Sequence, residues 1–377
     1  MPMLIGIDAS RADHLEKTGV EWYAWHLIQA LKQLPAQEAH TWLLYSEQAL
    51  SQALGDVPLS WHQRVLSWPL KRLWTQARLS VEMLQHKPDV LFIPAHTLPR
   101  VIPRRSVATI HDVGFFRHPE LYSSSERLWQ KLAVRSITRR ATRILTVSEY
   151  SKQEIVQFCQ VNPDRITVTY PGVDHLSTEE VTAFAKQDVM DRYRIQGPYF
   201  LYLGRLETKK NVATLVEAFR RYKEDRGLGD PVCLVLAGTV GDGYAAIQEA
   251  TNRAKLGTAL VQTGYVSEED KRTLIAGALA LVHPAWYEGF GFTPVEALRL
   301  GCPVICARVG SLPEVVGVEN AVWFEPSDPE ALAQALDRTV RDEASRLALI
   351  EEGRRWVTRY SWEVTAKQTL AALTDWS

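Results

Sequence analysis

The chain has 377 residues, of which 46% are hydrophobic, and its formal net charge is -1. This length and apolar content predict two domains, and the near-neutral charge argues against bulk binding of nucleic acid. Four scattered cysteines without a CxxC pair argue against a disulfide framework and favour the cytoplasm. We find neither a secretory leader nor an apolar run of ~20 residues, so any membrane contact is expected to be peripheral.

The first predicted strand, at residues 4–9, leads into a polar loop that ends in Gly19 and Val20, where a helix running to about Leu34 begins. Further strands with helical patterns between several of them are predicted at Thr41 to Tyr45, Asp89 to Pro94, Ser106 to Ile110 and Arg143 to Val147. This alternation predicts an α/β fold with a parallel sheet covered on both faces.

His111 and Asp112 follow the strand that ends at Ile110. In doubly wound sheets, ligands bind at the carboxyl ends of the strands. His111 is therefore a candidate site residue, and a hydrogen-bonded structural histidine is the alternative.

The predicted helix at residues 124–141 carries a cationic stripe of four residues at a spacing of four: Arg127, Lys131, Arg135 and Arg139. Leu128, Leu132 and Ile137 lie elsewhere on this helix and are expected to face the core. The stripe is typical of a solvated face. The alternative is a peripheral contact of Arg127, Lys131 and Arg135 with anionic lipid, or with an acceptor phosphate.

The periodicity is weak between residues 171 and 195, so the domain junction is placed there, with a boundary at 187. A strand at Tyr199 to Leu203 follows, then the loop GRLETKKN, then a helix. Arg205 and Lys210 bracket this loop, and a guanidinium paired with an ammonium suits a diphosphate; an ordinary basic loop is the alternative. More strands are predicted at Val232 to Ala237, Ala259 to Thr263, Ala278 to His283, Val304 to Ala307 and Ala321 to Phe324.

The stretch from His283 to Gly301 combines a strand end, a glycine loop and a helix start opened by Thr293 and Pro294. Backbone N–H groups and the positive end of a helix dipole converge at such a point. The stretch therefore predicts a site for a phosphorylated or polyhydroxyl ligand.

Two carboxylates lie in this stretch, Glu288 on the loop and Glu296 in the first helical turn. Thr293 and Glu296 also match a capping box, in which Glu296 would bond its own helix start and touch no ligand. Glu288 has no capping role, and the aromatic residues around it favour an apolar-walled pocket that contains a carboxylate.

Seven residues separate Glu288 from Glu296, as in the E-x7-E motif of the retaining glycosyltransferases of family 4, which this chain resembles. GRLETKKN is similar to the family's G-R-x-x-x-x-K-N segment, with Lys210 at the matching lysine. Gly19 and Val20 resemble the family's N-terminal glycine loop, and His111 with Asp112 resembles its sugar-facing histidine. The segment YSWEVTA resembles its C-terminal helix.

The resemblance implies a GT-B fold, with two Rossmann-like domains of doubly wound parallel sheets that face a cleft. Residues 1–187 would bind the acceptor and residues 188–360 the nucleotide-sugar donor. Residues 361–377 would form a helix that crosses back to the N-terminal domain.

The resemblance also implies a role for each matched residue. Arg205 and Lys210 would hold the donor diphosphate beside Gly204, and His111 would lie by the transferred sugar. Gly19, next to Val20, would let the backbone approach phosphate and acceptor, and Glu296 would accept from the ribose hydroxyls. The sugar hydroxyls would be held by Glu288 and by the backbone N–H groups of Phe290, Gly291 and Phe292.

The donor base is expected near Val266 and Glu268, since an acidic side chain can accept from guanine N1 and N2; a first-turn helix acid is the alternative for Glu268. GDP-mannose is favoured, because HDVGFFRHPE also resembles bacterial mannosyltransferases of polysaccharide assembly. UDP-glucose and UDP-N-acetylglucosamine remain alternatives. The acceptor is expected to be a sugar or a lipid-linked glycan.

No D-x-D motif is found, so a metal-independent mechanism without a cofactor is expected. Two other readings stay open: a phosphorylase or epimerase of the same fold, and a non-catalytic protein that binds sugar nucleotides.

Overall fold

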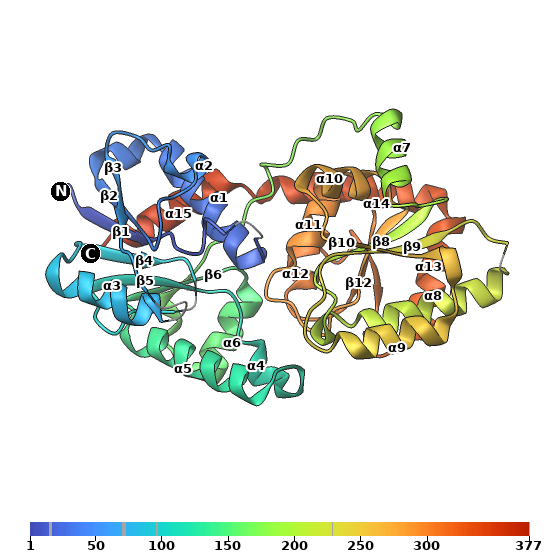
Figure 1. Cartoon of the computed structure of the whole chain (residues 1–377), viewed down its shortest axis with the longest axis horizontal. Helices are drawn as coiled ribbons and strands as arrows, with labels where there is room; N and C mark the ends of the chain where they lie inside the picture. Colours follow the sequence, from blue (N-terminus) through green and yellow to red (C-terminus); the bar gives the residue numbers. More distant parts are fainter. Residues whose placement is uncertain (15–16, 70–72, 96, 228, 377) are drawn as a thin grey trace. The chain divides into compact units, whose positions relative to one another are not determined.

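The computed structural model describes residues 1–14, 17–69, 73–95, 97–227 and 229–376. Contacts divide the chain into two compact units, Met1–Gly172 with Tyr360–Ser377, and Val173–Arg359 (Figure 1). The expected boundary at residue 187 falls inside helix α7 (Ala183–Arg192). This helix packs against α10 (Glu268–Gly277), and Arg192 at its end forms an ion pair with Asp270 at 2.6 Å. The segment before residue 187 thus includes part of the second unit.

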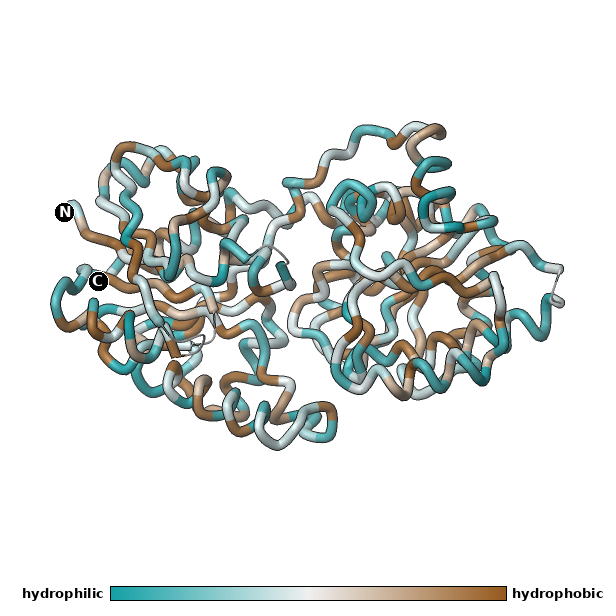
Figure 2. Tube along the Cα trace, in the orientation of Figure 1, coloured by the Kyte–Doolittle hydropathy of each residue, from teal (hydrophilic) through white to brown (hydrophobic). Residues whose placement is uncertain are grey.

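The first unit contains a sheet of seven strands in the order β3-β2-β1-β4-β5-β6-β7, and every neighbouring pair is parallel. Its strands are β1 (Leu4–Asp8), β2 (Thr41–Ser46), β3 (Trp61–Val65), β4 (Val90–Ile93), β5 (Arg105–Ile110), β6 (Arg143–Thr146) and β7 (Ile166–Val168). Figure 2 shows that the central strands are strongly hydrophobic, as expected for a sheet buried on both faces.

Helices cover both faces of this sheet. They are α1 (Gly19–Gln33), α2 (Gln52–Gly55), α3 (Trp74–Gln85), α4 (Gly114–Arg117), α5 (Ser124–Arg140), α6 (Glu149–Cys159) and α15 (Trp362–Thr374), with short 3-10 helices η1 (Pro35–Ala39), η2 (Pro119–Leu121) and η3 (Pro163–Arg165). Helices α3, α5 and α6 share one apolar core, to which they contribute Leu79, Ile137 and Ile155. Helix α1 packs instead against α15.

The last helix, α15, completes the first unit. The Trp362 ring stacks on His26 of α1, with centroids 5.2 Å apart, and Thr365 Oγ1 donates a hydrogen bond to Tyr170 O at 2.5 Å. A Cβ on Gly172 would lie 2.2 Å from the Trp362 nitrogen, so only glycine permits this approach of the two backbones.

The second unit contains a parallel sheet of six strands in the order β10-β9-β8-β11-β12-β13. Its strands are β8 (Tyr199–Leu203), β9 (Cys233–Ala237), β10 (Leu260–Gly264), β11 (Ala280–His283), β12 (Val304–Ala307) and β13 (Val322–Phe324). Besides α7 and α10, its helices are α8 (Val212–Arg226), α9 (Tyr244–Ala254), α11 (Phe292–Arg299), α12 (Leu312–Val316), α13 (Pro329–Arg341) and α14 (Glu343–Trp356), with η4 (Thr208–Lys210), η5 (Gly257–Ala259) and η6 (Val357–Arg359).

Both sheets reverse their strand order once, between β1 and β4 in the first unit and between β8 and β11 in the second. Ligands of open α/β sheets bind at the carboxyl ends of the strands at such switch points. The loop GRLETKKN follows β8 and the loop with Glu288 follows β11, so topology brings these two motifs together. The predicted α/β fold with two parallel sheets is confirmed.

Candidate active site

Glu288 lies on the β11–α11 loop and is ionised by its surroundings. Its carboxylate oxygen Oε1 accepts hydrogen bonds from Lys210 Nζ and from His283 Nε2, the latter at 2.8 Å. Burial alone would raise the pKa of Glu288, but the charge of Lys210 and the hydrogen bond from His283 outweigh it, so the pKa lies well below its usual range. A carboxylate in this state accepts hydrogen bonds and donates none.

The backbone of Glu288 is fixed by the loop that follows β12. Ser311 donates to the Glu288 carbonyl oxygen twice, from its backbone nitrogen at 3.1 Å and from its hydroxyl at 3.2 Å. Gly310 has a φ of +55°, and a Cβ there would lie 2.4 Å from the same oxygen. Glycine is therefore required beside the carboxylate.

Arg205 and Lys210 occupy the loop between β8 and α8, but they have different neighbours. The Lys210 ammonium contacts Glu288, whereas Arg205 is about half exposed and lies 3.8 Å from Glu207. The loop is anchored by Asn211, whose side-chain amide donates to Pro284 O at 3.1 Å. This bond joins the two motif loops at the switch point.

Gly204 opens the same loop, and its nitrogen donates to Ala237 O at 2.9 Å at the end of β9. A Cβ on Gly238 would lie 2.0 Å from the Gly204 carbonyl oxygen. The two glycines thus bring the backbones of neighbouring loops into contact, which leaves no space there for a larger residue.

The capping alternative for Glu296 is wrong. Helix α11 begins at Phe292 with Gly291 as N-cap, and no side chain caps it. The Glu296 carboxylate instead accepts from Lys271 Nζ at 3.2 Å. The sequence analysis did not identify Lys271, which comes from α10. Its position three residues after Glu268 is a sequence signal that could have indicated this ion pair.

Glu268 belongs to the same charged cluster, since Lys271 Nζ lies 2.6 Å from its carboxylate. Burial would lower the pKa of Lys271, but Glu296 and Glu268 outweigh it and raise the pKa above its ordinary value. The structure therefore brings Glu268 and Glu296 together on one largely buried cation. Val266 is buried just before them, and Ser267 caps α10 by accepting from Asp270 N at 3.1 Å.

The N-terminus of α11 is shaped by Gly291, which has a φ of +89°, and a Cβ on it would lie 2.6 Å from Leu312 Cδ2. The rings of Phe290 and Phe292 meet edge to face with centroids 5.1 Å apart. The first N–H groups of an eight-residue helix thus follow directly on the loop of Glu288, an arrangement suited to oxygen-rich ligands.

In the first unit, His111 is buried at the end of β5. Its Nε2 donates to Pro94 O, 3.0 Å away, and its ring meets the Tyr23 ring edge-on at 4.7 Å. Gly19 and Val20 are the first residues of α1, whose N-cap Thr18 bonds Glu21 through both its nitrogen and its hydroxyl. His111 and Gly19 thus lie near the switch point of their own sheet.

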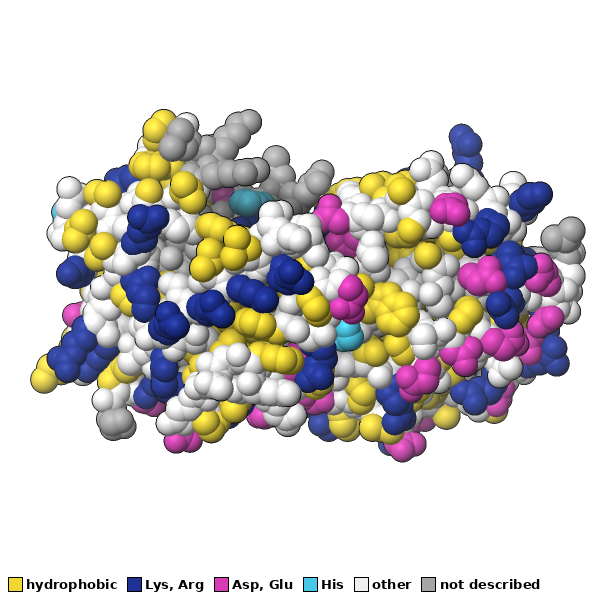
Figure 3. Space-filling view, turned by 90° about the horizontal axis from the view of Figure 1, so that it is seen from below, with side chains coloured by type: hydrophobic (Ala, Val, Ile, Leu, Met, Phe, Trp, Pro, Cys, Tyr) yellow, Lys and Arg dark blue, Asp and Glu magenta, His cyan; other side chains and the backbone are white. Residues whose placement is uncertain are grey.

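The expectation that Leu128 and Leu132 face the core is wrong. Their exposed fractions are 60% and 54%, and only Ile137 of the three is buried. At spacings of seven, both leucines share the side of α5 that carries Arg135 and Arg139. Figure 3 shows a face of the first unit on which Lys and Arg side chains gather among apolar ones.

Within the described ranges, no helix is both long and apolar enough to span a membrane. Nor do His, Cys, Asp and Glu form a group of three that could hold a metal in that part of the chain.

Two family models match the chain, Glycosyltransferase Family 4 over residues 17–175 and Glycosyl transferases group 1 over residues 189–356. The O-antigen chain mannosyltransferase B of Escherichia coli is 30% identical across 80% of this chain and 78% of that protein. The serotype-specific mannosyltransferase WbdA of the same organism is 25% identical across 72% of this chain, which corresponds to 34% of WbdA.

Solved structures share the fold. The Anabaena protein HepE in complex with UDP-glucose superposes with a TM-score of 0.75 at 18% identity, covering 99% of this chain and 100% of that one. WaaG, a glycosyltransferase involved in lipopolysaccharide biosynthesis, gives a TM-score of 0.74 at 15% identity, covering 98% and 99%.

Proposed function

The chain belongs to the glycosyltransferases of family 4 that carry a group 1 domain, and we propose that it is a retaining enzyme that transfers mannose from GDP-mannose to a sugar or lipid-linked glycan. The observation that carries this proposal is the pairing of Glu288 with Lys210 at the start of α11. It places a fixed negative group and a cation at one switch point.

The chemistry follows from where charge develops. Breaking the anomeric bond leaves negative charge on the diphosphate, which preorganised cations stabilise. Lys210 has three N–H donors, so it can hold Glu288 and a phosphate oxygen together, and the exposed guanidinium of Arg205 can bind the diphosphate bidentately. We assign no step to a metal.

Glu288 is proposed to bind sugar hydroxyls. Its depressed pKa keeps it ionised near neutral pH, so it is unsuited to protonating a leaving group. Glu288 and Glu296 also differ from the carboxylate pair of a glycoside hydrolase, which must flank the scissile bond. In the proposed reaction the acceptor hydroxyl attacks on the face that the diphosphate leaves, and a phosphate oxygen takes its proton.

Mannose as the transferred sugar is supported by the names of the two Escherichia coli relatives, and guanine by the position of Glu268 beside Glu296. UDP-glucose and UDP-N-acetylglucosamine are the competing donors.

A thermal-shift panel of GDP, UDP and ADP with their common sugars tests the donor, because a ligand that binds only the folded state raises its melting temperature. We expect GDP-mannose to give the largest shift. A larger shift with UDP-sugars would overturn the guanine assignment, and donor binding without turnover on any acceptor would favour a non-catalytic sugar-nucleotide-binding protein.

We also propose that the protein works in the cytoplasm at the inner face of a membrane, with Arg127, Lys131 and Arg135 contacting anionic lipid. Exposed Leu128 and Leu132 on the same helix support this, since basic and apolar groups together suit a lipid interface. Sedimentation with anionic liposomes tests it. Equal sedimentation of the native chain and a variant with all three residues changed to Gln would contradict it.

A further inference from the structure

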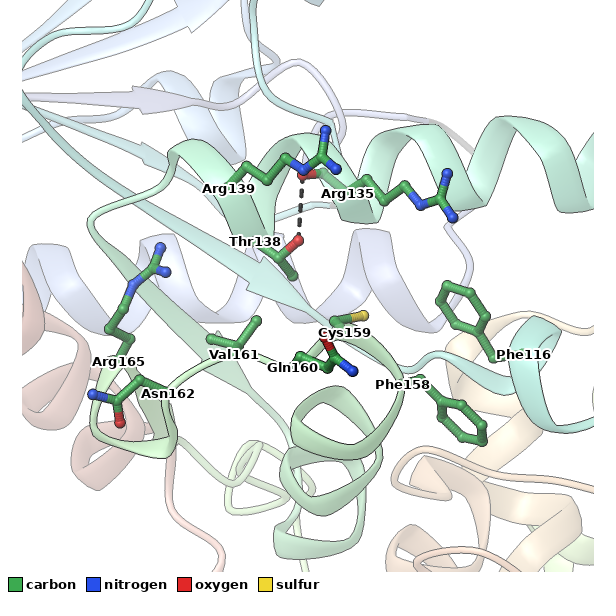
Figure 4. A pocket seen from close by; sticks show the side chains of 10 residues that line it. All are labelled: Phe116, Arg135, Thr138, Arg139, Phe158, Cys159, Gln160, Val161, Asn162 and Arg165. Carbon is green, nitrogen blue, oxygen red and sulfur yellow. Dashed lines mark hydrogen bonds between the residues drawn. The ribbon is translucent and has the colours of Figure 1, made fainter.

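A cavity of about 260 Å³ lies in the first unit, away from the switch point (Figure 4). Most of its walls come from the second half of α5, the end of α6 and η3, and Phe116 of α4 also lines it. Helix α5 ends just before β6 and η3 just before β7, so these walls lie toward the amino ends of the strands. His111 and Gly19 lie at the opposite, carboxyl edge.

Three guanidiniums line the cavity, those of Arg135, Arg139 and Arg165, and none of its lining residues is an acid. In the described part of the chain, no ion pair joins any of the three to Asp or Glu. The neighbouring Arg117 differs, because it pairs with Glu154. The cavity thus concentrates positive charge that the protein itself does not neutralise.

Other groups fix the geometry of this charge. Arg165 Nη2 donates to Ala141 O at 2.5 Å, which orients its guanidinium. The Asn162 side-chain oxygen accepts from Asp164 N at 2.9 Å, so what Asn162 can offer a ligand is its NH₂ donor. Figure 4 shows Arg135 and Arg139 on one side of the cavity and Arg165 with Asn162 on another.

The cavity also has an apolar end, where the rings of Phe116 and Phe158 stack with centroids 5.6 Å apart. Outside it, exposed Leu128 and Leu132 continue along α5 on the side of Arg135 and Arg139. A ligand that joins an anionic group to an apolar one would match both features.

We propose that this cavity binds a phosphate ester through Arg135, Arg139 and Arg165. A phosphate presents more acceptor oxygens than a carboxylate and can meet several guanidinium forks at once. The ester is either a soluble phosphomonoester or the phosphodiester of a lipid headgroup. A simpler explanation, that the arginines stabilise the carbonyl end of α5, accounts for Arg139 in the last turn and for the hydrogen bond of Arg165 to the C-cap residue Ala141. It does not account for Arg135, which lies before the last turn, or for a lining without acids.

Two probes distinguish the sources: titration of glycerol 3-phosphate followed by NMR, and sedimentation with phosphatidylcholine vesicles with or without phosphatidylglycerol. The test variant is Arg135→Gln with Arg139→Gln. The matched control is Lys87→Gln with Arg104→Gln, which removes the same charge from exposed side chains of the same unit outside the cavity. Arg135→Lys with Arg139→Lys keeps the charge and removes the bidentate fork.

We expect Arg135→Gln with Arg139→Gln to weaken binding at least about tenfold and the control variant to weaken it far less. Arg135→Lys with Arg139→Lys should weaken binding by an intermediate factor. Glycerol 3-phosphate binding would identify a soluble ester, and binding only to vesicles with phosphatidylglycerol a headgroup. Equal losses in the two Gln pairs, or no binding of either probe to the native chain, would overturn the proposal. Thermal melting of each variant verifies that it folds. The phosphate-binding measurements do not depend on sugar transfer, so they remain valid if the proposed transfer activity fails.

Discussion

Glu288 of the proposed active site shows how a largely buried carboxylate is kept ionised. It keeps its ionised form because Lys210 and His283 hold one of its oxygens, and Ser311 holds its backbone. We expect Glu288→Gln, Lys210→Ala and Arg205→Ala each to lower sugar transfer at least about a hundredfold, the scale seen when a preorganised electrostatic group is removed.

Initial rates with labelled donor measure this loss. Lys209→Ala is the matched control for Lys210, since it removes a neighbouring lysine whose ammonium lies 3.5 Å from Glu207. Wild-type rates in all three active-site variants would rule out the assignment.

The same carboxylate predicts an acid-dependent stability. Its folded-state pKa lies below the ordinary value of 4.5. The stabilisation is therefore complete above about pH 4.5 and is lost as the pH falls below that value, because the unfolded chain takes up the proton first. Urea midpoints of the native chain should fall more steeply between pH 5 and pH 3 than those of Glu288→Gln. Parallel curves would contradict the ion pair.

Lys271 sets the charge around Glu296 and Glu268. We expect Lys271→Met to raise the donor KM by about tenfold with a smaller change in kcat, because the two acids would lose the cation that orients them for binding. Steady-state kinetics measures this. Lys255→Met, on another helix end, is the control, and a fall in kcat alone would argue for a different role.

The residues of the candidate site that stand in sequence motifs could be predicted, whereas those contributed by other loops could not. Glu288, Glu296, Arg205 and Lys210 stand in contiguous motifs, so spacing identifies them. Lys271 and Ser311 come from other loops and meet the site only through tertiary packing, which local periodicity does not encode.

Among the elements, the loop after β12 supports the loop that carries Glu288 through the close approach of Gly310. Gly310→Ala should destabilise the protein by about 1–3 kcal/mol more than Gly257→Ala, because the new methyl group meets the Glu288 carbonyl. Gly257 is a matched control with the same φ of +55° and no atom within 4 Å of its added Cβ. It should report only the left-handed strain of about 1–2 kcal/mol. Chemical denaturation of both variants tests this, and equal losses would show that the contact is unimportant.

Element positions were predicted best where burial was complete. The strands β8, β9 and β12 match apolar runs in the sequence, whereas edge strand β3 (Trp61–Val65) is exposed at four of its five residues and gave no such signal. The burial of two residues on helix α5 was predicted wrongly. Leu128 and Leu132 were assigned to the core because they are apolar, but both are exposed beside the arginines.

At the scale of the whole molecule, the two parallel sheets could be predicted from the alternation of strands and helices in the sequence. The α15 contacts show that the first unit is built from both ends of the chain. Trp362→Ala should destabilise that unit by about 3–5 kcal/mol, because Trp362 is 5% exposed and packs on His26 and Tyr23.

Urea unfolding, monitored together with nucleotide-sugar binding at the site proposed in the second unit, tests this. We expect the first unit to unfold at a lower urea concentration while nucleotide binding persists. Trp323→Ala in the second unit is the control, and simultaneous loss of both units in Trp362→Ala would contradict their independence.

The return of α15 to the first unit also orders events during synthesis. Residues 173–359 form a continuous unit that can fold as soon as it leaves the ribosome, whereas residues 1–172 lack α15 until the segment after residue 359 has also emerged. Residues 1–172, although made before residues 173–359, therefore complete their fold only after them, and their uncovered α1 surface is exposed to aggregation until α15 arrives.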